Sequence, residues 1–74
     1  MDKIERNLRE ALRKTIILQE ESAKEEVELY LKNSGTDKEE KMLDEYDRVL
    51  WMIVDATNLL SDALLLYEKM RRER

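Results

Sequence analysis

The chain has 74 residues, enough for one domain, and a pair of helices of this size has little interior to bury. It contains no cysteine and no histidine, which excludes disulfides, thiolate chemistry and the most common metal ligand. The formal net charge is -4, and acidic and basic residues alternate along both halves, so no basic face is available for nucleic acid. We therefore expect no enzyme, no catalytic residues, no metal, no cofactor and no nucleic-acid partner.

Apolar runs in the chain are short. The longest is Val49–Val54, six residues ended by Asp55, whereas a membrane-spanning helix needs about 20 apolar residues. No apolar stretch of the signal-peptide kind lies near Met1. We expect a soluble chain without a targeting signal, cytoplasmic if natural, and without a membrane partner.

A first helix is predicted over about 2–33. Asp2 occupies a capping position with Glu5 three residues later, and neither Gly nor Pro interrupts the pattern before Asn33. We expect the side of this helix that carries most of its apolar residues to face inward: Ile4, Leu8, Ala11, Leu12, Thr15, Ile16, Gln19, Ala23, Val27 and Tyr30. Leu29 lies off the centre of that side, together with Ile17, Leu18 and Leu31.

A turn is predicted at 34–36. Gly35 is the only glycine in the chain, and a glycine just past a helix end supplies the positive φ that lets the chain leave the helix. Thr36 and Glu39 then have the spacing of a capping box. These signals predict a second helix over about 37–72 that returns antiparallel to the first.

The second helix is apolar around roughly two-thirds of its surface. Only one narrow stripe is reliably polar, formed by Asp44, Arg48, Asp55, Asp62 and Lys69. A surface helix of a monomer needs an apolar face only a little over about 100° wide, so the excess predicts contact with another chain. The predicted interface is a heptad seam with small flanking residues: Tyr46, Val49, Leu50, Ile53, Ala56, Thr57, Leu60, Ala63, Leu64 and Tyr67.

Polar residues also fall on the predicted inner faces. In an antiparallel hairpin turning at Gly35, Thr15 lies beside Thr57 and Glu26 beside Tyr46, which permits two cross-helix hydrogen-bonded layers. Gln19 and Ser61 are further candidates for such a network. The alternative is that the long side chains reach solvent and that the hydroxyl groups bond to carbonyls of their own helix.

Two further features of the second helix have a structural explanation. Asp55 and Asp62 lie about 10 Å apart along the helix axis, too far to share one metal ion, so we expect a solvated acidic stripe that also includes Asp44. Trp51 borders this stripe, and we expect it to pack at the boundary with a neighbouring helix.

The whole chain resembles, in style, de novo designed helical-hairpin bundles with buried hydrogen-bond networks. The resemblance rests on the glycine stop, the capping box, the charge-biased helix ends, the isolated polar groups inside, and the absence of Pro, Cys, His and Phe. It implies that assembly itself is the function. The run Trp51–Val54 and the four methionines would instead suit a natural oligomeric hairpin.

The sequence thus predicts an all-α antiparallel helical hairpin, one domain over 1–74, that forms a homo-oligomeric helical bundle. A homodimer is the first choice and a homotrimer the close rival. The alternative function is a partner-binding adaptor that presents an apolar helix groove to another protein's amphipathic helix.

Overall fold

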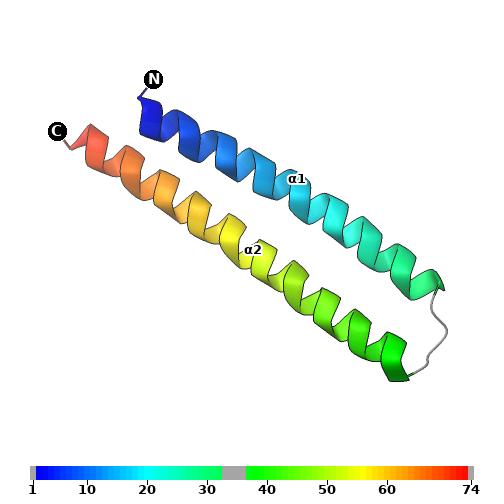
Figure 1. The fold of residues 1–74 in the computed structure, drawn as a ribbon. Coiled ribbons are helices and arrows are strands. Elements are labelled where there is room, and N and C mark those ends of the chain that lie inside the picture. The colour runs from blue at the N-terminus through cyan, green and yellow to red at the C-terminus, as the bar shows by residue number, and fades with distance from the viewer. Residues whose placement is uncertain (1, 33–36, 74) are drawn as a thin grey trace.

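Two antiparallel helices form the structure, a computed structural model that describes residues 2–32 and 37–73. Helix α1 spans Lys3–Lys32 and helix α2 spans Asp37–Arg72. They run side by side, with the N- and C-terminal ends together at one end of the hairpin (Figure 1). The predicted all-α hairpin is confirmed. The predicted turn at 34–36, including Gly35 and the Thr36 cap, lies outside the described residues.

The side chain of Asp2 caps the start of α1. Its Oδ1 atom accepts a hydrogen bond of 2.7 Å from the Ile4 amide, and its carbonyl oxygen accepts one of 3.0 Å from the Arg6 amide. A carboxylate at this position satisfies an amide that has no partner within the helix and interacts favourably with the helix dipole. The predicted capping role of Asp2 is therefore confirmed.

The two helices meet along matched heptad rows, which we call the contact ladder. On α1 the ladder residues are Glu5, Leu8, Leu12, Thr15, Gln19, Ser22, Glu26 and Leu29. On α2 they are Leu43, Tyr46, Leu50, Ile53, Thr57, Leu60, Leu64 and Tyr67. All are buried or half-buried, and both rows follow the alternating three- and four-residue spacing of coiled coils. Aligning the two rows in antiparallel order sets opposite one another residues whose numbers sum to 72, such as Thr15 and Thr57. We call each such pair a rung.

The predicted inner side of α1 is partly wrong. Five of its ten residues are exposed, namely Ile4, Ile16, Ala23, Val27 and Tyr30, whereas Leu29 is half-buried in the ladder. The prediction assigned about half of the helix circumference to the inner side. A single partner helix covers only a narrower seam, whose residues recur on average every 3.5 positions. Ser22 and Glu26 belong to that seam although they are polar.

The hairpin alone has almost no closed core. Among the described residues, only Leu43, Leu64 and Ser22 are buried, with exposed fractions of 6%, 8% and 8%. The accessible surface is 6177 Å², whereas a compact monomer of this 8.9 kDa mass exposes about 4,800 Å². The radius of gyration is 17.0 Å against about 11 Å for a compact chain of this length. The excess surface is about 1,400 Å², and much of it is apolar.

Candidate interaction surface

A second heptad row of α2 consists of exposed residues, and we call it the α2 stripe. Its seven members are Val49, Met52, Ala56, Leu59, Ala63, Leu66 and Met70. Each of the first six immediately precedes a residue of the contact ladder, so the stripe lies about 100° around the helix from the face that meets α1. Leu59 is 70% exposed and Met52 is 67% exposed. A heptad row of apolar side chains is the pattern by which one helix packs against another.

The ten residues predicted as the interface between chains divide into two groups. Seven of them lie on the contact ladder, where they meet α1 of the same chain: Tyr46, Leu50, Ile53, Thr57, Leu60, Leu64 and Tyr67. The other three, Val49, Ala56 and Ala63, are exposed members of the α2 stripe. The predicted interface did not include the other four members of the α2 stripe, Met52, Leu59, Leu66 and Met70, although their spacing of three and four residues is readable in the sequence.

Charged residues border the α2 stripe on one side. Arg48, Asp55, Asp62 and Lys69 recur at intervals of seven, each immediately before a stripe residue, and all four are exposed. Their charges run positive, negative, negative, positive along the helix. Positions of this kind flank the seam in coiled coils, where they influence which partner and which alignment is preferred.

The proposed hydrogen bond between Thr15 and Thr57 does not form. The Thr15 hydroxyl donates to the Leu12 carbonyl oxygen at 2.8 Å, and the Thr57 hydroxyl donates to the Ile53 carbonyl oxygen at 2.9 Å. Because a hydroxyl group has one hydrogen to donate, neither is left to bridge the helices. The two threonines share a rung, but each hydroxyl group bonds to a carbonyl of its own helix. This is the alternative interpretation given above.

A cross-helix polar cluster does form, in the half of the hairpin that lies away from the termini, with a different pairing from the predicted one. The Tyr46 hydroxyl donates to Glu25 Oε2 at 3.0 Å rather than to Glu26. Burial and this hydrogen bond both raise the pKa of Tyr46. The neighbour that raises the pKa of Glu26 is Asp47, which is half-buried.

The surroundings of the Glu26 carboxyl group disfavour its charged form. Its Oε2 atom is buried and has no hydrogen-bond partner. Desolvation raises the pKa of Glu26, and the hydrogen bond and charge of Asp47 raise it further. Two carboxyl groups this close favour a state in which one of them keeps its proton.

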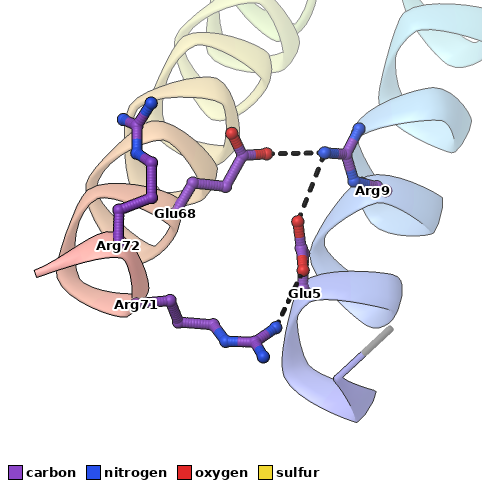
Figure 2. Close-up of a pocket in the computed structure, with 5 residues that line it drawn as sticks. All are labelled: Glu5, Arg9, Glu68, Arg71 and Arg72. Carbon is purple, nitrogen blue, oxygen red and sulfur yellow. Dashed lines mark hydrogen bonds and ion pairs between the residues drawn. The ribbon is translucent and has the colours of Figure 1, made fainter. Parts of the chain in front are cut away.

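Ion pairs between α1 and α2 close the end of the hairpin where the termini lie. Arg9 donates to Glu68 at 2.7 Å and to Glu5 at 3.3 Å, and Arg71 donates to Glu5 at 3.1 Å (Figure 2). The shallow pocket among these side chains is also lined by Arg72. Its charged groups mostly satisfy one another, so the arrangement holds the helix ends together rather than offering a reactive group.

The acidic stripe predicted on α2 faces solvent. Asp44, Asp55 and Asp62 are exposed. Across residues 2–32 and 37–73, no group of three acidic side chains is placed to hold a metal ion. Trp51, predicted to pack at a helix boundary, is 60% exposed within the single chain.

Helix α2 has the length and composition of a membrane-spanning helix over Glu40–Arg72, where the best 18-residue window has a mean hydropathy of 1.6. It is the one such helix within the described part of the chain. Asp55 and Asp62 fall in the middle of its apolar part, and each would cost about 2.5 to 3.5 kcal/mol at the centre of a bilayer.

No protein-family model matches the chain, and comparisons with the curated proteins and with the solved structures found no match.

Proposed function

We propose that this protein is a structural self-assembly module, a helical hairpin that associates with copies of itself through the α2 stripe. The observation that carries the proposal is the stripe itself: seven apolar residues in unbroken heptad spacing, all exposed in the single chain. The proposed role is assembly in aqueous solution, without catalysis and without a cofactor.

The amount of surface supports this proposal. The hairpin exposes 6177 Å², about 1,400 Å² more than a compact protein of its mass. A standard protein–protein interface buries about 800 Å² on each partner. Association with one further copy through an interface of this size would remove more than half of that excess.

The polar groups around the stripe favour a second helix over a lipid phase. Asp55 and Asp62 border the stripe, and a helix–helix interface leaves such flanking positions in water. A membrane would have to bury both carboxylates. α1 carries charged residues along its whole length, so it would stay outside the bilayer.

The direct experiment is sedimentation equilibrium on the purified chain over a wide range of concentrations. We expect a discrete multimer, a dimer first, that dissociates on dilution. We also expect the thermal midpoint to rise with protein concentration, because so small a unit should couple folding to association. A monomer mass throughout, with a constant midpoint, would overturn the proposal.

A matched pair of variants locates the contact. Met52→Glu places a charge in the α2 stripe, while Leu31→Glu places one at a residue of α1 that is 83% exposed and lies off both the ladder and the stripe. We expect Met52→Glu to abolish the multimer, because association would bury an unpaired charge, and Leu31→Glu to leave the mass unchanged. Equal effects of the two variants would show that the stripe is not the contact.

The two competing roles predict other outcomes. A membrane-binding helix would make the chain sediment with phosphatidylcholine vesicles, and Met52→Glu would release it. An adaptor for another protein's helix would be a stable, helical monomer at all concentrations. Either result would replace the proposed function.

A further inference from the structure

We propose that two copies pair through the α2 stripe with their α2 helices antiparallel, in the register that sets Ala56 level with Leu66 of the second copy. This inference rests on the proposed self-association and adds the direction and alignment of the partner helix. Side-chain sizes in the stripe, the charges beside it and the exposed flank of α1 each contribute to the argument.

Short and long side chains alternate along the stripe. Ala56 and Ala63 belong to one heptad row, and Leu59 and Leu66 belong to the other. In a parallel, in-register pair each layer contains the same residue from both chains, so close Ala layers would alternate with wide Leu layers. In an antiparallel pair each layer combines one residue from each row. Both alanines then meet a longer side chain, and one helix separation suits the whole stripe.

Two antiparallel registers bury six of the seven stripe residues. In the first, Val49 is level with Leu66 of the second copy, and Met70 is left out. In the second, Met52 is level with Met70 of the second copy, and Val49 is left out. Packing alone does not separate them, because both place Ala56 and Ala63 against longer side chains.

The charged residues beside the stripe distinguish these registers. The first brings Arg48 next to Lys69 of the second copy and Asp55 next to Asp62, so every contact joins like charges. The second brings Asp55 next to Lys69 twice, once on each side of the two-fold axis, and places the two Asp62 side chains near that axis. Opposite charges at flanking positions favour the alignment that pairs them, which is the second register.

The exposed flank of α1 fits the second register independently. Ile4, Ala11 and Leu18 recur every seven residues, and each immediately precedes a ladder residue, as the α2 stripe residues do. Because both helices are right-handed and antiparallel, residues displaced in the same sense from the ladder lie on the same side of the hairpin. Ile4 is 54% exposed and Leu18 is 46% exposed, whereas Ala11 between them is half-buried.

The alignment of α2 with its copy also fixes which α1 residues of the two copies lie at the same level. With rungs summing to 72, the second register sets Ile4 level with Leu18 of the second copy and Ala11 level with itself. The first register would set Ile4 level with Glu25. The second register therefore brings two exposed apolar side chains of α1 together, and an antiparallel pair of this kind is a two-fold, four-helix dimer rather than a trimer.

Disulfide trapping tests the register directly, because the chain has no cysteine of its own. Ala56→Cys and Leu66→Cys are made in separate chains of different mass, checked for helicity and multimer mass under reducing conditions, then mixed and oxidised. We expect the 56–66 disulfide to exceed all others at least tenfold, because a disulfide requires Cα atoms within about 7 Å. The two Ala56→Cys sites would be about 15 Å apart along the axis.

The remaining cysteine combinations define the contrary results. A dominant 56–56 disulfide would establish a parallel arrangement, and a dominant disulfide between Ala56→Cys and Leu59→Cys would establish the first antiparallel register. Leu31→Cys gives the background from random collisions. If the reduced variants form multimers but no pair exceeds this background, the stripe pairing is wrong although self-assembly stands. If they and the unmodified chain are monomers, the proposed function fails as well.

A charge exchange provides a second readout that needs no cysteine. Asp55→Lys and Lys69→Asp should each weaken dimerisation severalfold, and the double variant should recover it, because the opposite charges are restored between chains. If the double variant dimerised more weakly than either single variant, so that the two effects simply added, the pairing of Asp55 with Lys69 would be contradicted.

Discussion

Leu59→Ala should weaken self-association by about two to three orders of magnitude. The substitution removes three carbon atoms, worth about 2.4 kcal/mol if they are fully buried in the wild-type assembly. Leu59 is 70% exposed in the single chain, so about 1.7 kcal/mol of this is gained only on association. In a dimer the loss occurs twice, about 3.4 kcal/mol, which corresponds to an increase of about 300-fold in the dissociation constant.

Sedimentation equilibrium measures this change, and two neighbouring truncations serve as controls. Leu31→Ala removes the same atoms from a side chain that is 83% exposed and off the stripe, so its dissociation constant should stay within about threefold of wild type. Leu60→Ala acts on the half-buried contact ladder and should destabilise the hairpin itself by about 1 to 2 kcal/mol. If Leu59→Ala and Leu31→Ala had the same dissociation constant, the stripe would not be an interface.

Three further outcomes follow from the described contacts. Leu60→Asp should unfold the hairpin, because it buries a charge against α1 of the same chain; circular dichroism that retained full helicity would contradict the ladder. Glu26→Gln should raise the thermal midpoint at pH 7 and flatten its pH dependence. The pKa of Glu26 is raised by burial and by Asp47, so its stabilising contribution is present below pH 4.5 and is lost as the pH rises through the higher folded value. Thr57→Val should leave stability and mass nearly unchanged or slightly raise stability, because the hydroxyl serves only the Ile53 carbonyl within its own helix; a mixture of masses in native mass spectrometry would revive the network interpretation.

Local sequence signals were sufficient to predict the helices and their pairing. Asp2 is a strong capping residue, and no Gly or Pro interrupts either helix. The row from Tyr46 to Tyr67 repeats apolar residues at coiled-coil spacing, which led to its recognition as a seam. These properties depend on residues close in the chain, so no tertiary information was needed to read them.

The partner of each face could not be predicted in the same way. Helix α2 carries two apolar rows one residue apart, the ladder and the stripe, and pattern alone does not assign either to α1. The assignment depends on α1, whose ladder includes Ser22 and Glu26 and therefore does not look apolar. Hydroxyl orientation was equally undetermined, because Thr15 can bond to its own helix or across it with similar geometry.

The distribution of polar residues between the two faces of α2 indicates where the stabilising free energy lies. The ladder within one chain places Glu5, Gln19, Ser22 and Glu26 of α1 against α2, and buried polar groups offset part of the gain from apolar contact. The α2 stripe contains no polar residue. Burial of the stripe against a second apolar helix would therefore add hydrophobic stabilisation without that polar cost. For the proposed assembly we expect the helices and the interface between copies to form together.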